Sequence, residues 1–533
     1  MQLQSLIENL GLTLVSGDGG QELSDLTDDS RGVKPGGLFV ARSSGGADDE
    51  RWRQYAGDAI RRGVSAVIAP AVLDVPAGVS LVVSRDAATR IDQPFVGRLA
   101  ARFFGEPAKR LKLIGITGTN GKTTVATLTQ YLLNAAGVKC GLLGTVAIDD
   151  GAPDGPVNAE LTTPGAIDLH RYFAEMVANG CEACAMEVSS HALDQGRVDG
   201  LEFAVAVFTN LTQDHLDYHG TMENYAAAKA KLFTLLKPDG IVVVNADSSA
   251  LIEITPSDIQ HIRWTTIDLN GLPSASVSDR ETSYVIAGEI WALESSESTF
   301  GISGLTGVAD ASMFSMSLPG RHNVSNMLQA ITAIQMIWPM AMDELTEAVA
   351  DCTGVPGRLE VVEAQSGDAP SILVDYAHTP DALTNVLNAL RPLLIRGGRL
   401  ICVFGCGGDR DRTKRPLMAQ VACGLADVAV LTSDNPRTED PRQILDDAIA
   451  GVPPEAKSKL VVEIDRARAI ESAILNADVH DTVLIAGKGH EDYQILGTEK
   501  IHFDDREHAA VALNKWVAQN QTEGSAGDAG GGT

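Results

Sequence analysis

A short glycine-rich segment holds the residues best suited to phosphate chemistry. The segment Gly118-Thr119-Asn120-Gly121-Lys122-Thr123-Thr124 follows the apolar run from Leu111 to Ile116 and precedes apolar residues at helical spacing. A loop that leads from a strand into a helix binds phosphate, because its N–H groups converge and the helix dipole favours an anion. Lys122 would contact the terminal phosphates and Thr123 would offer its hydroxyl to Mg²⁺. The spacing is GxxGKT, shorter than GxxxxGK[ST], so a glycine turn that serves packing alone is the alternative.

Two later segments carry candidate metal ligands. Glu187 ends an apolar run, and His215 lies a few residues after the run from Phe203 to Phe208. Both are expected at the carboxyl ends of strands, where ligands of open α/β sheets gather. A carboxylate suits Mg²⁺, whereas an imidazole is a less usual ligand for this ion. Spacing alone would favour Asp214 or Asp217 over His215.

The overall charge and composition exclude several classes of protein. The 533 residues include 42 Lys and Arg against 70 Asp and Glu, a formal net charge of −28 that disfavours nucleic acid and anionic membranes as partners. No run of 18 apolar residues predicts a membrane-spanning helix, and no signal peptide is recognised. Seven dispersed cysteines do not indicate a disulfide framework, which fits a reducing cytoplasm.

The length predicts several domains, since one hydrophobic core rarely serves so long a chain. Short strands and helices over 1–109 predict a small α/β domain. Alternating strands and helices over 110–356 predict a central P-loop domain with a mostly parallel sheet, and a second such set over 357–519 predicts a Rossmann-like α/β domain. The Gly- and Ala-rich residues 520–533 are expected to form a disordered tail. The predicted fold class is therefore α/β with three domains.

Taken in order, the motifs of this chain resemble those of the Mur ligase family. The resemblance extends to about residue 515. Besides the glycine-rich loop and the segments of Glu187 and His215, its marks are Leu318-Pro319-Gly320-Arg321-His322-Asn323, Asp375-Tyr376-Ala377-His378-Thr379-Pro380, Gly407-Gly408-Asp409-Arg410, Asp434-Asn435-Pro436-Arg437 and Gly487-Lys488-Gly489-His490-Glu491. So many matches in one order are not expected by chance. The resemblance implies that the short GxxGKT loop binds ATP.

The resemblance also implies which residues bind nucleotide and metal. ATP would be bound by the loop from Gly118 to Thr124 together with Asn323, Arg358 and Asp375. Mg²⁺ would be bound by Thr123, Glu187, His215 and Lys229. Lys229 matches a lysine that the family carries as N6-carboxylysine, which turns a cation into an oxygen ligand. Unaided, the sequence indicates only a solvated helix charge at this position. The implied catalytic residues are Lys122, Lys229 and His215.

Two further substrate sites are implied by matching positions. A UDP-linked muramyl dipeptide would be bound by Ser30, Gly45, Gly46, Ala47, Thr162, Thr163, Ser189, Gln195 and Arg197, with Leu161 where some relatives have Asn. The amino acid meso-2,6-diaminopimelate would be bound by Arg410, Asp434, Asn435, Pro436, Arg437, Gly487 and Glu491. Arg437 would pair with the distal carboxylate of this amino acid, a group that L-lysine lacks.

The reaction implied by the resemblance is ATP-dependent formation of an amide bond in peptidoglycan precursor synthesis. ATP would phosphorylate the D-glutamyl γ-carboxylate, and the diaminopimelate amine would then displace phosphate. The partners would be small molecules only, and the chain would act as a cytoplasmic monomer. Two alternatives stay open. One is a lysine-adding or folylpolyglutamate-type ligase, and Arg437 counts against the lysine-adding enzyme. The other is a P-loop ATPase that switches partners with its nucleotide state.

Replacing Lys122 tests the assignment of the glycine-rich loop. The Lys122→Ala variant is expected to lose ligation, because the lysine would offset charge on the transferring phosphoryl group. Its circular dichroism spectrum and melting temperature should match those of the unchanged chain. Ligation retained at the unchanged rate would remove this lysine from the mechanism.

Overall fold

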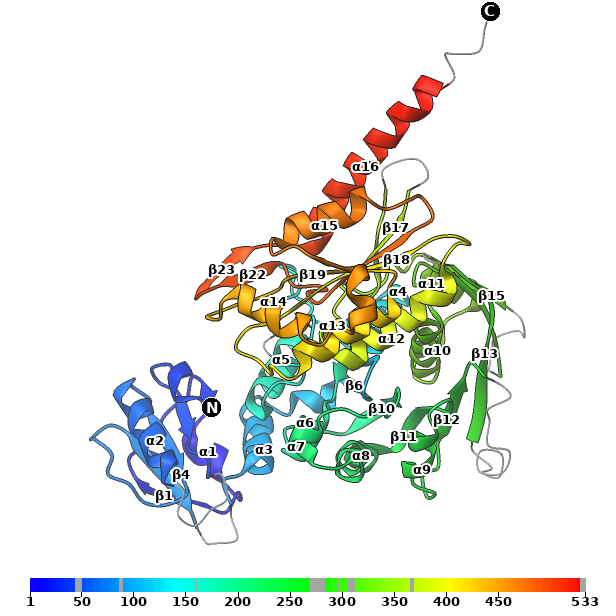
Figure 1. Cartoon of the computed structure of the whole chain (residues 1–533). Helices are drawn as coiled ribbons and strands as arrows, with labels where there is room; N and C mark the ends of the chain where they lie inside the picture. The colour runs from blue at the N-terminus through cyan, green and yellow to red at the C-terminus, as the bar shows by residue number, and fades with distance from the viewer. Residues whose placement is uncertain are drawn as a thin grey trace, which may run out of the picture. The chain divides into compact units, whose positions relative to one another are not determined.

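Strands rich in Val, Ile and Ala alternate with helices along most of the chain, as an α/β fold requires. The computed structural model describes residues 1–43, 50–85, 90–159, 161–268, 283–294, 297–304, 312–364 and 369–527 (Figure 1). The chain packs as two compact units, composed mainly of Met1–Thr266 with Gln329–Met340 and of Ala287–Leu328 with Ala341–Thr533. The α/β class is confirmed. The predicted boundaries at 109 and 356 do not coincide with these units and stay predictions.

The first sheet of the first unit has the order β1-β5-β4-β3-β2. Its strands are parallel except for the β1–β5 pair. The strands are β1 (Leu12–Ser16), β2 (Leu26–Thr27), β3 (Leu38–Val40), β4 (Ala66–Ala69) and β5 (Ser80–Ser84), and the helices are α1 (Leu3–Ile7), α2 (Arg51–Arg61) and α3 (Gln93–Phe103). Separate apolar clusters cover the two faces of this sheet, one with α1 and α3 and the other with α2.

A larger sheet in the first unit carries the glycine-rich loop. It belongs to a ten-stranded sheet with the order β15-β14-β13-β12-β11-β10-β6-β9-β7-β8, in which the pairs between β12 and β7 are parallel. The strands up to β12 are β6 (Lys112–Thr117), β7 (Cys140–Leu143), β8 (Ile148–Asp149), β9 (Ala183–Glu187), β10 (Phe203–Phe208), β11 (Leu236–Asn245) and β12 (Ile262–Thr266). The connecting helices are α4 (Lys122–Ala135), α5 (Ala166–Ala178), α6 (Ser190–Asp194), α7 (Leu216–His219), α8 (Met222–Ala230) and α9 (Ser249–Ile254). Because parallel strands end at one edge, residues 118, 188 and 209 emerge close together.

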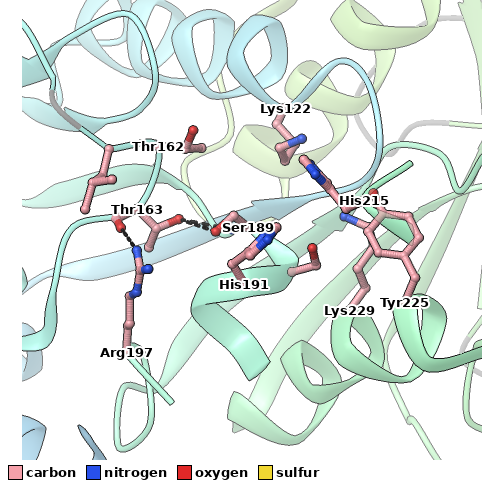
Figure 2. A pocket seen from close by; sticks show the side chains of 11 residues that line it. Lys122, Thr162, Thr163, Ser189, His191, Arg197, His215, Tyr225 and Lys229 are labelled. Carbon is pink, nitrogen blue, oxygen red and sulfur yellow. Dashed lines mark hydrogen bonds between the residues drawn. The ribbon is translucent and has the colours of Figure 1, made fainter. Parts of the chain in front are cut away.

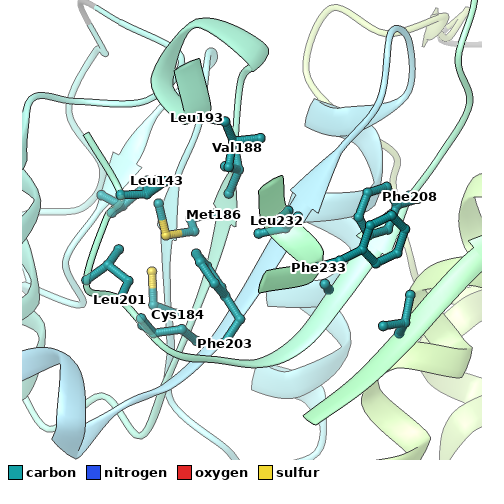
Figure 3. Close-up of a cluster of buried hydrophobic side chains, with 14 of the residues drawn as sticks. Leu143, Cys184, Met186, Val188, Leu193, Leu201, Phe203, Phe208, Leu232 and Phe233 are labelled. Atoms are coloured by element: carbon teal, nitrogen blue, oxygen red, sulfur yellow. The ribbon is translucent and has the colours of Figure 1, made fainter. Parts of the chain in front are cut away.

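Buried aromatic and sulfur-containing side chains fill the core beside this sheet (Figure 3). The rings of Phe208 and Phe233 stack with centroids 4.0 Å apart and planes 12° apart. Cys184 and Met186 lie in the same cluster, fully buried. Burial raises the pKa of the Cys184 thiol well above its ordinary value, so the thiol packs as a neutral apolar group.

An antiparallel meander and two helices follow along the chain. Strands β13 (Ser283–Leu293), β14 (Ser298–Ser303) and β15 (Ser312–Met316) pair in sequence. The stacked rings of Phe300 and Phe314 lie on their buried face. Helices α10 (Arg321–Gln335) and α11 (Met342–Ala350) follow the meander.

The last sheet has the order β16-β17-β21-β18-β19-β20, and only the β16–β17 pair is antiparallel. Its strands are β16 (Glu360–Val362), β17 (Ser371–Asp375), β18 (Leu400–Cys406), β19 (Val428–Ser433), β20 (Leu460–Val462) and β21 (Thr482–Ala486). Helices α12 (Pro380–Leu390), α13 (Lys414–Leu425) and α14 (Pro441–Ile449) cover one face, and α15 (Arg466–Leu475) and α16 (Asp505–Gly527) cover the other (Figure 1). A parallel sheet between two helix layers is the Rossmann-like arrangement that the sequence predicts.

Two features concern the C-terminal part of the chain. The hairpin β22 (Tyr493–Leu496) and β23 (Glu499–His502) precedes α16. That helix extends to Gly527, and residues 528–533 lie outside the described residues. The disordered tail expected over 520–533 stays a prediction. No helix within the described ranges has the length and apolar composition needed to cross a membrane.

Candidate functional site

The glycine-rich loop joins the end of β6 to the start of α4. Gly118 has φ 148° and Gly121 has φ 84°, both in the region that favours glycine. A Cβ atom at Gly118 would lie 1.9 Å from the Thr209 hydroxyl oxygen, so a side chain does not fit there. The first turn of a helix has no internal partners for its N–H groups. The start of α4 therefore offers an anion both donors and the positive end of a dipole.

A second segment, which follows β10, holds this loop in place. The Asn210 side chain forms a pair of bonds with the Asn120 backbone, since Oδ1 accepts from its N–H at 2.9 Å and Nδ2 donates to its carbonyl at 3.0 Å. The Thr119 N–H donates to the Asn210 carbonyl at 3.0 Å. The Thr119 hydroxyl donates to the Thr212 carbonyl, and the Thr212 N–H donates back to this hydroxyl, both at 3.0 Å. These bonds hold the loop in its described conformation.

Two amino groups converge on the carbonyl oxygen of Gly118. The Lys122 Nζ donates to it at 3.0 Å and to the Thr119 carbonyl at 2.8 Å. The Lys229 Nζ donates to the same Gly118 oxygen at 2.7 Å and lies 4.6 Å from the centre of the Tyr225 ring. Lys229 is only 1% exposed. Burial, followed by the charge of Lys122, lowers the pKa of the Lys229 amine well below its ordinary value.

The predicted metal ligands come from different elements of the same sheet edge. Glu187 ends β9, where its carboxylate accepts from the Thr145 N–H at 2.7 Å and from the Thr145 hydroxyl at 3.2 Å. His215 precedes α7 in the left-handed conformation, with φ 52°, and its Nε2 lies 3.4 Å from an Asp214 carboxylate oxygen. Thr123 lies in the first turn of α4 and is buried. The described residues contain no group of three or more His, Cys, Asp or Glu that could hold a metal ion by themselves.

A pocket of about 300 Å³ lies between the loop and the helix α6 region. It is lined by Lys122, Leu161, Thr162, Thr163, Ser189, Ser190, His191, Arg197, His215, Tyr225 and Lys229. Figure 2 shows Lys122, His215, Tyr225 and Lys229 on one side of it and Thr162, Thr163 and Arg197 on the other. The pocket thus joins the predicted phosphate-binding residues to four of the residues predicted for the muramyl dipeptide, Thr162, Thr163, Ser189 and Arg197.

Hydrogen bonds order the predicted substrate side of the pocket. The Thr163 hydroxyl donates to the Glu187 carbonyl at 2.8 Å. Arg197 Nη1 donates to the Thr163 carbonyl at 2.9 Å (Figure 2). Gln195 is not a lining residue, but its Oε1 accepts from Arg197 at 2.6 and 2.9 Å. Ser30 is buried in the first sheet's region and does not line this pocket. Gly45, Gly46 and Ala47 lie outside the described residues.

Sequence reasoning did not select three polar side chains of the pocket: Ser190, His191 and Tyr225. The rings of His191 and His215 lie edge to face at 4.9 Å. The Tyr225 hydroxyl lies 3.2 Å from the Thr119 hydroxyl of the loop. His191 follows Glu187 closely and so could have been chosen from its place after a strand. Tyr225 comes from α8, and only the tertiary structure brings it to the loop.

The three other predicted ATP residues lie in the second unit. The Asn323 Nδ2 donates to the Pro319 carbonyl at 2.9 Å in the first turn of α10. The Arg358 guanidinium lies 5.0 Å from the centre of the Tyr376 ring. Asp375 ends β17, and its carboxylate accepts from the N–H groups of residues 359 and 377 at 2.8 Å. Burial raises the pKa of Asp375 although Arg358 opposes this shift.

The residues predicted to bind diaminopimelate gather at the carboxyl ends of β18, β19 and β21. Arg437 Nη1 donates to the Gly408 carbonyl at 2.8 Å, and Asn435 Nδ2 donates to a Glu491 carboxylate oxygen at 3.0 Å. Arg410 is exposed, and Gly487 is buried with φ 120°. Pro436 packs so closely that a Cβ at Gly408 would lie 1.9 Å from its carbonyl oxygen.

Lys488 supplies a cation in this cluster that sequence reasoning did not assign. Its Nζ lies 3.1 Å from an Asp434 carboxylate oxygen and donates to Asn435 Oδ1 at 3.0 Å. Burial works to raise the pKa of Asp434, but Lys488 and Arg466 outweigh it and lower this pKa. Burial and the charge of Asp434 raise the pKa of Glu491. The cluster therefore combines two guanidinium groups, an ammonium group and two carboxylates.

Comparison with known proteins identifies the family. A family model described as the Mur ligase middle domain matches residues 116–334, and one described as the Mur ligase glutamate ligase domain matches residues 357–489. A protein of Synechococcus elongatus named UDP-N-acetylmuramoyl-L-alanyl-D-glutamate--2,6-diaminopimelate ligase is 47% identical over 92% of this chain and 94% of its own. This chain belongs to the Mur ligase family.

Two further Mur ligases support the assignment over the full length. A protein of the same name from Parasynechococcus marenigrum is 46% identical over 96% of this chain and 99% of its own. A solved structure of a ligase of that name is 32% identical, covers 98% of this chain and 99% of its own, and superposes with a TM-score of 0.62. The resemblance inferred from the motifs is confirmed, and the roles predicted for individual residues stay predictions.

Replacing Gly118 tests the loop of this Mur ligase. A methyl group at Gly118 would collide with Thr209 and with the Asn210 backbone, and φ 148° disfavours any side chain. The Gly118→Ala variant is therefore expected to raise the KM for ATP by more than about tenfold. Steady-state kinetics against ATP measures the effect.

The matched control is Gly424→Ala. Gly424 lies within α13, where an added Cβ has no atom within 4 Å, so this variant should keep the KM for ATP and gain a little stability. An unchanged KM for ATP in the Gly118→Ala variant would contradict the assignment of this loop as the ATP site.

Proposed function

We propose that this Mur ligase joins meso-2,6-diaminopimelate to UDP-N-acetylmuramoyl-L-alanyl-D-glutamate with the energy of ATP, in peptidoglycan precursor synthesis. The names of the relatives that share 46–47% of their residues with this chain support the proposal. ATP would phosphorylate the γ-carboxylate of the D-glutamyl residue and leave ADP and an acyl phosphate. The amine of diaminopimelate would attack the acyl carbon, form the amide bond and release phosphate.

The charge pattern at the ends of β18, β19 and β21 carries the choice of amino acid. The distal end of diaminopimelate has a carboxylate and an ammonium group, and the cluster there offers both Arg437 and the carboxylates of Asp434 and Glu491. A guanidinium can bind a carboxylate through two parallel N–H donors. With L-lysine bound, the same guanidinium would lose this partner, which disfavours lysine.

The residues around the loop would position and neutralise the reacting groups. Lys122 would move from the loop carbonyls to the phosphate oxygens, where its charge offsets that of the transferring group. The pocket side that carries Thr163 and Arg197 would bind the anionic muramyl substrate next to the loop.

The donor set near the loop suits Mg²⁺ once Lys229 is carboxylated. Mg²⁺ prefers oxygen ligands and commonly takes one or two carboxylates together with phosphate oxygens. Glu187 and Thr123 offer such oxygens, whereas the neutral amine of Lys229 offers none. Carboxylated Lys229 and His215 would complete the set. Bound there, Mg²⁺ would reduce the negative charge on the phosphate oxygens.

The chemistry of the thiols supports a reducing compartment. All seven cysteines are free and buried. We therefore place the ligase in the cytoplasm, where ATP and UDP-linked precursors are available, and expect it to act there as a monomer.

A phosphate-release assay tests the proposed function. Release should require both the muramyl dipeptide and meso-diaminopimelate, and L-lysine should support at least about a hundredfold lower kcat/KM, because Arg437 would then lack its carboxylate. The Arg437→Ala variant should lose most of this preference. Release that is independent of both substrates would indicate a nucleotide switch instead of a ligase.

Carbon dioxide should determine how much of Lys229 is carboxylated. A buried amine with a lowered pKa is neutral where exposed lysines are charged, and only a neutral amine reacts with CO₂. Removal of CO₂ is expected to slow ligation and bicarbonate to restore it, and ¹³C-labelled CO₂ should give a carbamate signal in NMR spectra. Lys229→Ala should abolish both effects.

Lys231→Ala is the control for this experiment, since Lys231 is half-exposed and pairs with Asp194 at 3.0 Å. It should keep the response to CO₂ and the carbamate signal. A carbamate signal that persists in the Lys229→Ala variant would place the modification elsewhere.

A further inference from the structure

An arginine that the reaction does not use is completely buried at the start of α13. The Arg415 side chain is 0% exposed. Its Nη2 donates to Glu439 at 2.7 Å and to the Gly407 carbonyl at 3.3 Å. Its Nη1 donates to Glu439 at 3.0 Å and to Asp447 at 2.8 Å. A buried guanidinium requires such partners, because an unpaired charge is strongly disfavoured away from water.

Two partners of Arg415, Gly407 and Glu439, belong to two loops, whereas Asp447 belongs to α14. One loop, residues 407–410, follows β18, and the other, residues 434–439, follows β19. Glu439 accepts from the Asp409 N–H at 2.5 Å, so it ties both loops together. The Asp409 carboxylate accepts from the Thr438 N–H at 3.1 Å and from the Thr438 hydroxyl at 2.9 Å. The hydrogen bonds of Arg415 lower the pKa of Glu439 to about 2, so its carboxylate stays charged at neutral pH.

Each loop contains one residue in a strained backbone conformation. In one loop this residue precedes a predicted amino-acid-binding residue, and in the other it is such a residue itself. Asp409 has φ 53° and Arg437 has φ 52°, a conformation that residues other than glycine rarely adopt. Such conformations persist only when their surroundings fix them. Arg437 is fixed further by its N–H bond to the Ile495 carbonyl at 3.1 Å and by the Gly408 carbonyl. Asp409 directly precedes Arg410, so its conformation directs that side chain.

We propose that Arg415 is a positioning residue for amino-acid selection, which deepens and rests on the proposed function. Its guanidinium holds the two loops at a fixed separation, so that Arg410 and Arg437 present their charges to one diamino dicarboxylic acid. Arg415 itself touches no substrate. Its loss should weaken binding of meso-diaminopimelate and the discrimination against L-lysine, while leaving the binding of ATP unaffected.

The test compares three variants by steady-state kinetics against each substrate. Arg415→Gln should raise the KM for meso-diaminopimelate by about tenfold or more and narrow the preference over L-lysine, with the KM for ATP within about twofold. The KM of Arg415→Lys for meso-diaminopimelate should lie between those of the unchanged chain and Arg415→Gln. Lysine keeps the charge of arginine but lacks its planar guanidinium. Glu439 is the partly exposed partner of Arg415, and Glu439→Gln keeps its size but removes its charge. This variant should also raise the KM for meso-diaminopimelate.

Arg412→Ala is the matched control. Arg412 lies near Arg415 in sequence, is 59% exposed and shares the Asp447 carboxylate at 2.9 Å. It donates to neither Glu439 nor Gly407 among the described contacts. This variant should keep all three KM values. A larger rise in the KM for meso-diaminopimelate in Arg412→Ala than in the Arg415 variants would overturn the inference, because surface charge would then explain the effect.

Other outcomes separate this inference from the proposed function. If the unchanged chain does not ligate meso-diaminopimelate, the proposed function fails and the inference fails with it. If the unchanged chain ligates but Arg415→Gln only lowers the melting temperature, or raises every KM alike, Arg415 serves stability alone. Should neither arginine variant fold, Glu439→Gln decides, and an unchanged KM for meso-diaminopimelate in that variant overturns the inference.

Discussion

The convergence of two amino groups on the Gly118 carbonyl is the constraint on which the first unit's site depends. Lys122 and Lys229 share this acceptor in a place where Lys229 is almost fully buried. Two positive charges cannot lie so close away from water without a large cost. The lowered pKa of Lys229 reduces this cost, because it favours the neutral form of that amine. An anion at the loop would offset the charge that remains on Lys122. The arrangement therefore favours binding of phosphate.

In both large sheets, the candidate site lies at the carboxyl ends of parallel strands. In the central sheet, the loop follows β6, Glu187 ends β9 and the segment that clamps the loop follows β10, all at one edge. In the last sheet, the predicted amino-acid contacts follow β18, β19 and β21, which are adjacent although β21 comes last in the chain. Parallel strands with crossover helices leave their carboxyl ends free for ligands. Each sheet therefore builds a site from segments distant in sequence.

Buried ion pairs secure the loops of the second unit at the expense of desolvation. Arg466 and Asp505 are both 0% exposed and lie 2.6 Å apart, and Arg466 also donates to the Ala486 carbonyl just before Gly487. Apolar packing would stabilise such positions at least as well, so pairs of this kind point to specificity of arrangement more than to stability. The left-handed residues Asp409 and Arg437 lie in the same region. Strain and buried charge thus occur where the chain would select its amino acid.

The sequence by itself determined the features that depend on local order. It predicted the α/β class from alternating runs, and the phosphate loop from a strand, two glycines and a lysine at the start of a helix, since these need only neighbouring residues. The ordered motifs identified the family. Local order could not reveal that Asn210 clamps Asn120, that Tyr225 reaches Thr119 or that Lys229 is buried, because those contacts join segments about 90 residues or more apart. Only the tertiary structure decided them, along with the burial of Arg415 between two loops. Burial and long-range pairing follow from how strands order in a sheet, and hydrophobic periodicity does not encode that order.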